Sequence, residues 1–290
     1  MSRPVPVVPD RADILQALFG VPKPIIGMIH VRPLPGAPRY RDEPMQEITR
    51  AALADAVTCI DGGVDGLVVE NAGDIPFRHP DRLGAETTAS LAVIAAAVRD
   101  AVDVPIGINV LANGVIQSLA IAKAVDAQFV RANQWVNAYV ANEGIVQGAA
   151  AEALRYRGCL HAENIRVFAD VHVKHGSHAI VADRSLTELT HDAEFFDADV
   201  LIATGQRTSA PTPTDEVAGV KEASTLPVII GSGLSVDNVD ELLAVADGAI
   251  VGSSVKDDGV WWNPVSRARV EAIMERVRAL RAAQPLEVPR

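Results

Sequence analysis

Eight short apolar runs alternate with longer segments of helical periodicity along most of this 290-residue chain. Short apolar runs bounded by turn residues predict buried strands, and their alternation with helices predicts a parallel sheet. Eight such units fit a closed α/β barrel, the (β/α)8 TIM barrel, with an open doubly wound sheet as the structural alternative. The expected strands are Pro24–His30, Gly66–Asn71, Pro105–Val110, Ala127–Asn133, Ile165–His175, Val200–Gly205, Val228–Ile230 and Ala249–Val251.

The segments between these runs carry the expected helices. They are Arg11–Phe19, Pro44–Gly62, Thr88–Ala101, Val115–Val125, Gly144–Arg157, Leu186–Phe195, Asp215–Ala223 and Asn263–Ala283. Gln134–Glu143 precedes one of them and is expected to cross over the strand ends. No linker divides the chain, so we expect an N-terminal extension with a short helix (1–22), one barrel domain (23–284) and a loose tail (285–290).

The last two predicted strands both end in turns of small residues. Glycine lets the backbone approach a ligand closely, and N–H groups at a strand end and helix start can point together at an anion. In a (β/α)8 barrel, the loops after strands seven and eight often form a phosphate site. We therefore expect a phosphate-binding barrel whose anion contacts Gly231, Ser232, Gly233, Gly252, Ser253 and Ser254.

The predicted fifth strand, Ile165–His175, has one apolar face and one face that becomes charged towards its carboxyl end. Alternate residues of a strand point to opposite sides, which places Asp170, His172 and Lys174 together on the inward face. Ionisable groups are costly there unless they are paired or hydrated. A functional role is therefore the favoured interpretation, and an edge strand with one wet side is the alternative.

Polar residues also stand at the ends of other predicted strands. Taken singly, each is most often a cap or a loop contact, but in succession they describe a pocket at the carboxyl ends of the strands, where such barrels keep their active sites. His30 joins the catalytic candidates at this end, and Glu70 does so from the second strand. The candidate substrate-binding residues are Asn71, Asn109, Arg131, Asn133 and Thr204.

Several roles are open to the ionisable candidates. Glu70 or Asp170 is a possible general base, and His172 or His30 a possible general acid. Lys174 is a charge clamp or an imine-forming amine; the clamp is favoured, because a nearby Asp170 carboxylate opposes the depressed pKa that an imine requires. A divalent metal held by these carboxylates and imidazoles is possible, but their strands are scattered, so no metal site and no cofactor is predicted.

Composition narrows the class of protein. The net charge is −11, with 26 basic and 37 acidic residues, which argues against a nucleic-acid partner or an anionic membrane. No apolar run approaches the ~20 residues of a membrane-spanning helix, and the N-terminus has no apolar signal core. Cys59 and Cys159 lack metal-site spacing and are expected to be reduced interior residues. We expect a cytoplasmic location, no membrane insertion and a phosphorylated small molecule as partner.

The motifs together resemble the BtpA/SgcQ family. The similarity covers about Pro24 to Arg269. It is carried by "IGMIHVRPLPGAPRY" (Ile26–Tyr40), "VENAGDIPF" (Val69–Phe77), "GINVLANG" (Gly107–Gly114), "FVRAN" (Phe129–Asn133), "EGIVQGAAAEALRYR" (Glu143–Arg157), "FADVHVKHG" (Phe168–Gly176), "VIIGSGLSVDNV" (Val228–Val239) and "ADGAIVGSSVKDDGVWWNPV" (Ala246–Val265).

The resemblance implies a phosphate-binding barrel without a settled reaction. The family takes its name from a protein linked to biogenesis of photosystem I, while other members are associated with sugar-utilisation genes. The chain departs from the family pattern at Ala112 and Gly114, in "RANQWVNAYVANEGI", and at Ser209. These are loops where substrate would be recognised, so the substrate is expected to differ from the family norm.

Two functions therefore follow as expectations. The first is an enzyme acting on a phosphorylated metabolite such as a sugar or nucleoside phosphate, by isomerisation, lyase-type cleavage or hydrolysis. The second is a non-catalytic assembly or biogenesis factor; binding without catalysis is a further possibility. We also expect a homo-oligomer, with Trp261-Trp262 packed under the final helix, closing the pocket or forming a dimer contact.

Overall fold

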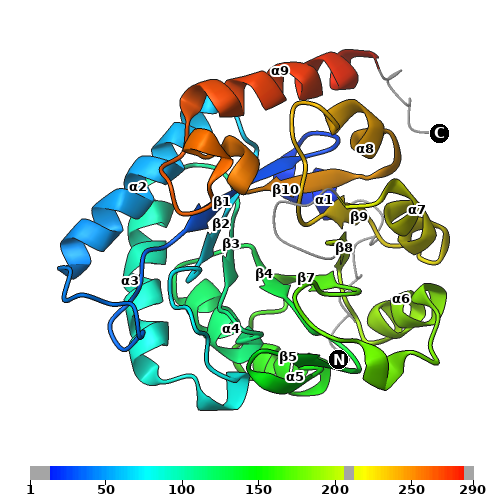
Figure 1. The fold of residues 1–290 in the computed structure, drawn as a ribbon, viewed down its shortest axis with the longest axis horizontal. Helices are drawn as coiled ribbons and strands as arrows, with labels where there is room; N and C mark the ends of the chain where they lie inside the picture. The colour runs from blue at the N-terminus through cyan, green and yellow to red at the C-terminus, as the bar shows by residue number, and fades with distance from the viewer. Residues whose placement is uncertain (1–13, 206–211, 284–290) are drawn as a thin grey trace, which may run out of the picture.

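The computed structural model describes residues 14–205 and 212–283, and it is a closed barrel of eight parallel strands (Figure 1). The order around the barrel is β1-β10-β9-β8-β7-β4-β3-β2, so consecutive units lie side by side and the last strand closes on the first. The predicted (β/α)8 barrel is confirmed. The strands are β1 (Ile25–His30), β2 (Gly66–Glu70), β3 (Ile106–Asn109), β4 (Phe129–Ala132), β7 (Arg166–Asp170), β8 (Val200–Ala203), β9 (Val228–Ile230) and β10 (Gly248–Val251).

A ring of helices covers the outside of the barrel (Figure 1). The turn after the second helix shows why these segments end where the sequence predicts: Gly63 takes a left-handed conformation (φ 98°) and its N–H caps the carbonyls of Cys59 and Ile60. The helices are α1 (Ile14–Phe19), α2 (Met45–Gly62), α3 (Ala85–Ala101), α4 (Val115–Ala124), α5 (Ala150–Cys159), α6 (Leu186–Phe195), α7 (Thr214–Glu222), α8 (Val239–Val245) and α9 (Arg267–Ala283).

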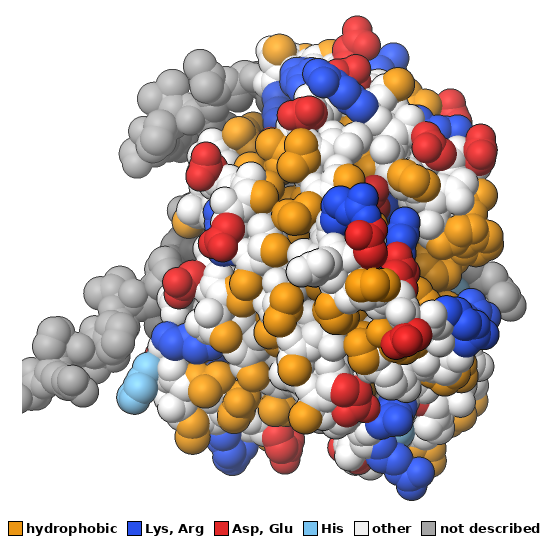
Figure 2. Space-filling model, turned by 90° about the vertical axis from the view of Figure 1, so that its left-hand side faces the viewer, with side chains coloured by type: hydrophobic (Ala, Val, Ile, Leu, Met, Phe, Trp, Pro, Cys, Tyr) orange, Lys and Arg blue, Asp and Glu red, His pale blue; other side chains and the backbone are white. Residues whose placement is uncertain are grey.

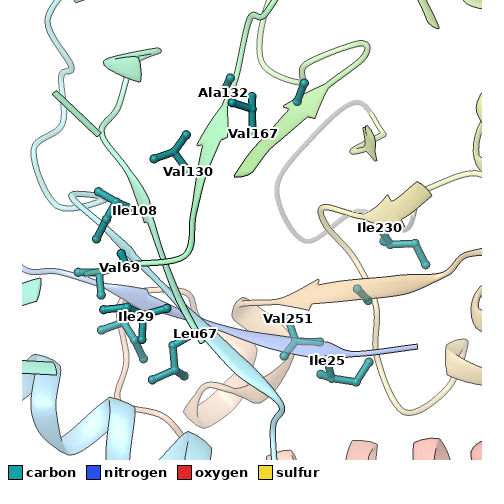
Figure 3. Packing of buried hydrophobic residues seen from close by; sticks show 14 of the residues in the cluster. Ile25, Ile29, Leu67, Val69, Ile108, Val130, Ala132, Val167, Ile230 and Val251 are labelled. Atoms are coloured by element: carbon teal, nitrogen blue, oxygen red, sulfur yellow. The ribbon is translucent and has the colours of Figure 1, made fainter. Parts of the chain in front are cut away.

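Strand alternation divides the core into two layers. Side chains pointing outwards pack beneath the helices, as Figure 3 shows for Leu67, Val69, Ile108 and others of the cluster. Side chains pointing inwards form a separate cluster in the barrel, where Phe129 and Phe168 stack with ring centroids 4.4 Å apart. The barrel interior is therefore a packed core and not a pore.

Helix α1 is part of this inner core. Ile14 and Leu15 are 2% and 6% exposed and belong to the same cluster as the inward-facing strand residues. Phe19 meets Phe129 edge to face, with centroids 6.0 Å apart. The N-terminal helix thus closes the amino-terminal end of the barrel, leaving the carboxyl ends of the strands for the site. The expected start of this helix at Arg11, the rest of the N-terminal extension and the tail lie outside the described residues.

Two predictions about segment type are wrong. The fifth barrel strand ends at Asp170 and not at His175; the chain bends beyond it although the apolar alternation continues. The segment Gly144–Gln147, expected to begin a helix, is strand β6 of an antiparallel hairpin with β5 (Ala138–Ala141). The excursion predicted over Gln134–Glu143 is therefore the first half of a hairpin.

The surface mixes charges of both signs. Figure 2 shows the face on the left of Figure 1, where basic side chains lie next to acidic ones and apolar side chains are scattered between them. Within the described ranges, no helix has the length and apolar character to cross a membrane. The net charge is consequently not concentrated in one block on this face.

Candidate active site

The inward-facing residues change character near the carboxyl end of every barrel strand. Along β4, Phe129 belongs to the apolar inner core, and Arg131, two residues later on the same face, is charged. The other strands follow the same pattern: an inward-facing residue that is apolar or glycine is followed two positions later by one that is polar or glycine. The resulting upper layer consists of His30, Glu70, Asn109, Arg131, Asp170, Thr204, Gly231 and Gly252.

Arg131 and Asp170 form a buried bidentate ion pair in this layer. Nε of Arg131 donates to Oδ1 of Asp170, and a terminal guanidinium nitrogen donates to Oδ2, both at 3.0 Å. Their side chains are 4% and 0% exposed. Asn133 donates a further hydrogen bond to Oδ2 at 3.3 Å. With both carboxylate oxygens occupied, Asp170 is poorly placed for the general-base role considered above.

His30 and Glu70 face each other on adjacent strands. Nε2 of His30 lies 3.8 Å from Oε1 of Glu70, and Nδ1 of His30 lies 3.0 Å from the carbonyl oxygen of Trp261. Burial, and then the charge of Lys256, lower the pKa of His30 to about 3. The ring is thus neutral near pH 7, with Nδ1–H donating to Trp261 and a free lone pair on Nε2.

Burial raises the pKa of the Glu70 carboxyl, although the nearby Arg131 and Lys174 oppose this effect. Oε2 accepts a hydrogen bond from the Asn109 side chain at 2.6 Å. A raised pKa brings a carboxyl closer to the pH range in which it can both give and take a proton, which suits it to general acid–base chemistry. Glu70 and His30 together therefore form a pair capable of proton transfer.

Two amide side chains are oriented by these carboxylates. Each donates its NH2 group, Asn109 to Glu70 and Asn133 to Asp170. Their side-chain oxygens are buried and have no hydrogen-bond partner in the part of the chain that the structure describes. Since buried acceptors are normally satisfied, these oxygens are available to a donor such as water or a hydroxyl group.

Lys174 follows β7 by four residues and lines the same pocket. Burial, and then the Arg131 charge, lower its pKa to about 8, against the opposing charges of Asp170 and Glu70. No hydrogen bond or ion pair holds its ammonium group within residues 14–205 and 212–283. The structure therefore places an amine with a depressed pKa beside the carboxyl layer.

Both glycine–serine turns open into this pocket. The cavity has a volume of about 570 Å³, within the range of small-molecule sites. Gly231 must remain small, because an added Cβ would lie 2.5 Å from Ile202 and 2.9 Å from Thr204. Within the described ranges, no backbone hydrogen bond uses the amides of Ser232 and Gly233. All six predicted turn residues line the cavity: Gly231, Ser232, Gly233, Gly252, Ser253 and Ser254.

Five candidate residues do not line the cavity. Asp170 and Asn109 are held by the contacts described above, and the other three are His172, Thr204 and Asn71. His172 stacks on His178, with centroids 3.7 Å apart, and is not a lining residue, because the strand that would have turned it inwards ends two residues earlier. Thr204 donates to the His172 carbonyl at 3.1 Å. Asn71 accepts from the Leu111 amide at 2.7 Å and donates to Asp74 at 2.9 Å. The structure gives these side chains loop-holding contacts.

His30, Glu70, Asp170 and His172 do not come together as a metal centre. Asp170 is occupied by Arg131, and His172 points away from His30 and Glu70 to its stack with His178. No group of three His, Cys, Asp or Glu side chains in the described part of the chain is arranged to hold a metal ion.

The β5–β6 hairpin and several loops supply lining residues that are not among the candidate site residues. Tyr139, Asn142 and Glu143 come from the hairpin, whose position is fixed by the bridge of Val140 to Ser177. Trp261 lines the cavity and meets His30 edge to face, while Trp262 is 69% exposed. The available signal was the pair of β-prone tetrapeptides "AYVA" and "GIVQ" on either side of Asn142-Glu143. The loop contribution is apolar: Ala72, Ile75, Pro76, Phe77, Leu111 and Ala112.

Closed strands and a packed floor define a (β/α)8 barrel, with a polar pocket at the carboxyl ends of its strands as the candidate site. Solved structures with this fold include tryptophan synthase from Mycobacterium tuberculosis (TM-score 0.57, 16% identity, 92% of this chain and 96% of that chain). Another is phosphoribosyl anthranilate isomerase from Thermus thermophilus (TM-score 0.54, 15% identity, 89% of this chain and 99% of that chain). Likeness at this level of identity shows the fold alone.

The chain belongs to the BtpA family, whose model matches residues 21–279. An uncharacterized protein from Thermococcus kodakarensis is 42% identical over 260 residues, covering 89% of this chain and 97% of the relative. The photosystem I biogenesis protein BtpA from Synechocystis is 34% identical over 264 residues, covering 91% of this chain and 90% of the relative.

A third relative bears on location. It is an uncharacterized protein of Caenorhabditis elegans, 35% identical over 274 residues, covering 92% of this chain and 98% of the relative. Its name describes it as mitochondrial. The cytoplasmic location expected for this chain therefore stays a prediction, as does its assembly into a homo-oligomer.

Proposed function

We propose that the protein is an enzyme that carries out acid–base chemistry on a small phosphorylated metabolite. One observation carries the proposal: the turns after β9 and β10 open into the same cavity as His30, Glu70 and Lys174. Phosphate is placed at Ser232-Gly233 and Gly252–Ser254, where small residues leave the backbone accessible. The rest of the metabolite then extends over the polar layer of the barrel.

The polar layer supplies the groups for proton transfer. Glu70, with its raised pKa, gives and takes a proton, and the neutral His30 ring accepts one at Nε2. This reverses the assignment of His30 as general acid and removes Asp170 as base, since its pairing with Arg131 holds the floor of the site. The free oxygen of Asn133, which lines the cavity, suits a hydroxyl-bearing ligand such as a sugar phosphate.

Ligand-dependent stabilisation tests the phosphate assignment. A ligand at about 100 times its dissociation constant stabilises the native state by about 2.7 kcal/mol, which raises the melting temperature by several degrees. Ribose 5-phosphate, glyceraldehyde 3-phosphate and dihydroxyacetone phosphate are compared with their unphosphorylated counterparts. We expect at least one phosphorylated compound to raise the melting temperature while its unphosphorylated counterpart does not. An equal change in melting temperature with both members of every pair contradicts the proposal.

A matched pair of serine variants localises the effect. Ser232→Asp places a carboxylate at the proposed anion site and is expected to abolish the stabilisation by charge repulsion. Ser185→Asp is the control, since the Ser185 side chain caps α6 by accepting from the Glu188 amide, a role that Asp performs equally well. Loss of the response in both variants would show that it does not depend on the turn.

The biogenesis protein among the relatives supports assembly as a second candidate function. Glu70→Gln and Lys174→Met separate the two candidates, because they change the pocket chemistry and leave the outer surface intact. A purely assembling protein retains its cellular role in both variants. An enzyme loses turnover by orders of magnitude while the fold, measured by circular dichroism, is kept.

A further inference from the structure

Lys174 differs from every other lysine of the chain in having no partner in the part that the structure describes. Lys23 donates to the Leu243 and Ala246 carbonyls, and Lys123 to the His161 carbonyl. Lys221 pairs with Asp247, and the buried Lys256 pairs with Asp55 at 2.5 Å. An amine left without a counterion inside a cavity is poorly suited to a structural role and well suited to reaction with a ligand.

The acidic groups around Lys174 are already engaged. Both oxygens of Asp170 accept from Arg131, and Glu70 accepts from Asn109 while facing His30. A free Asp170 carboxylate would keep the lysine charged and so oppose an imine, but both oxygens of Asp170 are paired with Arg131. The lowered pKa, about 8, leaves roughly a tenth of the amine neutral at pH 7 and about half at pH 8.

We propose that Lys174 forms an imine with an aldehyde or ketone carbon of the ligand, so that the substrate is a phosphorylated carbonyl compound. This rests on the proposed function for the phosphate and adds the reactive group. Attack by Nζ forms the C–N bond and moves the carbonyl electron pair to oxygen. The nitrogen loses its protons, the oxygen gains two and leaves as water, and the nitrogen lone pair completes the C=N bond.

The site contains what this condensation needs without an added oxidant or reductant. Glu70 and His30 carry the protons between nitrogen and oxygen, as both line the cavity with Lys174. The glycine–serine turns that line the same cavity hold the phosphate. An imine converts the carbonyl into an electron sink, which permits cleavage or isomerisation at the neighbouring carbon.

Reductive trapping tests the imine. The full-length protein is incubated with glyceraldehyde 3-phosphate, dihydroxyacetone phosphate, ribose 5-phosphate, glyceraldehyde or dihydroxyacetone, and sodium cyanoborohydride is added. Intact mass and peptide mapping then locate the secondary amine. We expect at least a tenfold excess of adduct on Lys174 over the other lysines, rising from about pH 6 to about pH 9 with a midpoint near 8.

Two variants separate the imine from a charge clamp. Lys174→Arg keeps the positive charge and cannot form the imine, whereas Lys174→Met removes both. Loss of the adduct in both variants, with phosphate-dependent stabilisation kept in Lys174→Arg, supports the proposal. Retention of the same adduct yield in Lys174→Met, or an even distribution over the lysines, overturns it.

The failure of this proposal is distinguishable from failure of the proposed function. Stabilisation by phosphorylated compounds with no trapped adduct from any carbonyl probe overturns the imine and leaves the phosphate site standing. Trapping on Lys174 that is equally efficient with glyceraldehyde and glyceraldehyde 3-phosphate supports the imine and contradicts the phosphate site.

Discussion

Arg131 and Asp170 meet in a bidentate ion pair directly above the stacked rings of Phe129 and Phe168. Each charged residue lies two positions after the aromatic residue of its own strand and on the same face. The apolar core therefore gives way to the polar site within two residues. The pair closes the floor of the cavity on this side. It also neutralises Asp170 and leaves Lys174 without that counterion.

We expect Arg131→Met to destabilise the protein by about 3–5 kcal/mol, because it leaves the Asp170 carboxylate buried without its partner. Urea unfolding monitored by circular dichroism measures the change. Arg267→Met, which breaks solvent-exposed pairs with Glu271 and Asp61, is the control and should leave the midpoint unchanged. Equal effects of the two substitutions would contradict the assignment of Arg131 to the floor of the site.

Strand alternation made the barrel and its polar layer predictable from sequence. Inward positions such as Met28 and His30, or Ile202 and Thr204, repeat the same apolar-to-polar step on separate strands, and this repetition is visible without coordinates. The parallel closure brings these positions to one level. The fold and the general position of the pocket were therefore predictable, because both depend on a local period of two.

The errors arise where apolar residues pack against something other than a barrel strand. Val173 continues the alternation of β7 beyond Asp170, but it packs with Tyr139 and Val146 beneath the hairpin. The helical composition that begins after Gly148 does not extend back to Gly144, because Gly144 has φ 114° and an added Cβ at Gly148 would lie 2.6 Å from the Trp135 carbonyl oxygen. Such long-range contacts leave no mark in a local pattern.

Two glycines provide a test of packing around the site. Gly231→Ala is expected to destabilise the protein by about 1–3 kcal/mol, since the added methyl group overlaps Ile202 and Thr204. Gly158→Ala lies in helix α5 with nothing within 4 Å and is expected to stabilise by about 0.5–1 kcal/mol through helix propensity. Chemical denaturation of both variants checks the opposite signs, and a neutral Gly231→Ala would contradict the close contact.

Helix α1 should contribute to the stability of the barrel itself. Ile14 is 2% exposed in the inner core, so Ile14→Ala is expected to cost about 2–5 kcal/mol. Ile180→Ala is a control of the same chemistry, because Ile180 is 54% exposed. If thermal unfolding finds equal, small effects, α1 does not pack as an integral part of the barrel.

His30 should make stability depend on acid pH. Its pKa is about 3 in the native state, against an ordinary value of 6.5, so the unfolded chain binds more protons between these values. The free energy of unfolding therefore falls as pH decreases through this window, by up to about 1.4 kcal/mol per pH unit. His30→Asn, which keeps a donor for the Trp261 carbonyl, should reduce this slope in urea titrations.

His172 provides a comparison for the pH dependence of the free energy of unfolding. Burial, and then the nearby His178, lower the pKa of His172 to about 4, so its contribution ends at a higher pH. His172→Asn should reduce the slope between about pH 6 and 4 and leave it unchanged near pH 3. A His30→Asn protein with the full wild-type slope would show that His30 is charged in the native state.

Lys174 should reduce stability at neutral pH. Its pKa is about 8 in the native state against 10.5 when unfolded, so the unfolded chain binds more protons between these values and stability rises as pH increases through them. Lys174→Met removes the cost of burying an ammonium that has no partner among the described residues. We expect this variant to be more stable than the wild type at pH 7 by on the order of 1 kcal/mol, with the difference disappearing above about pH 10.5. Lys256→Met is the control with the opposite sign, because it leaves Asp55 without its buried partner and should cost about 3–5 kcal/mol. If both lysine variants are destabilised alike at pH 7, Lys174 has a counterion in solution, and its amine is not available to a carbonyl group.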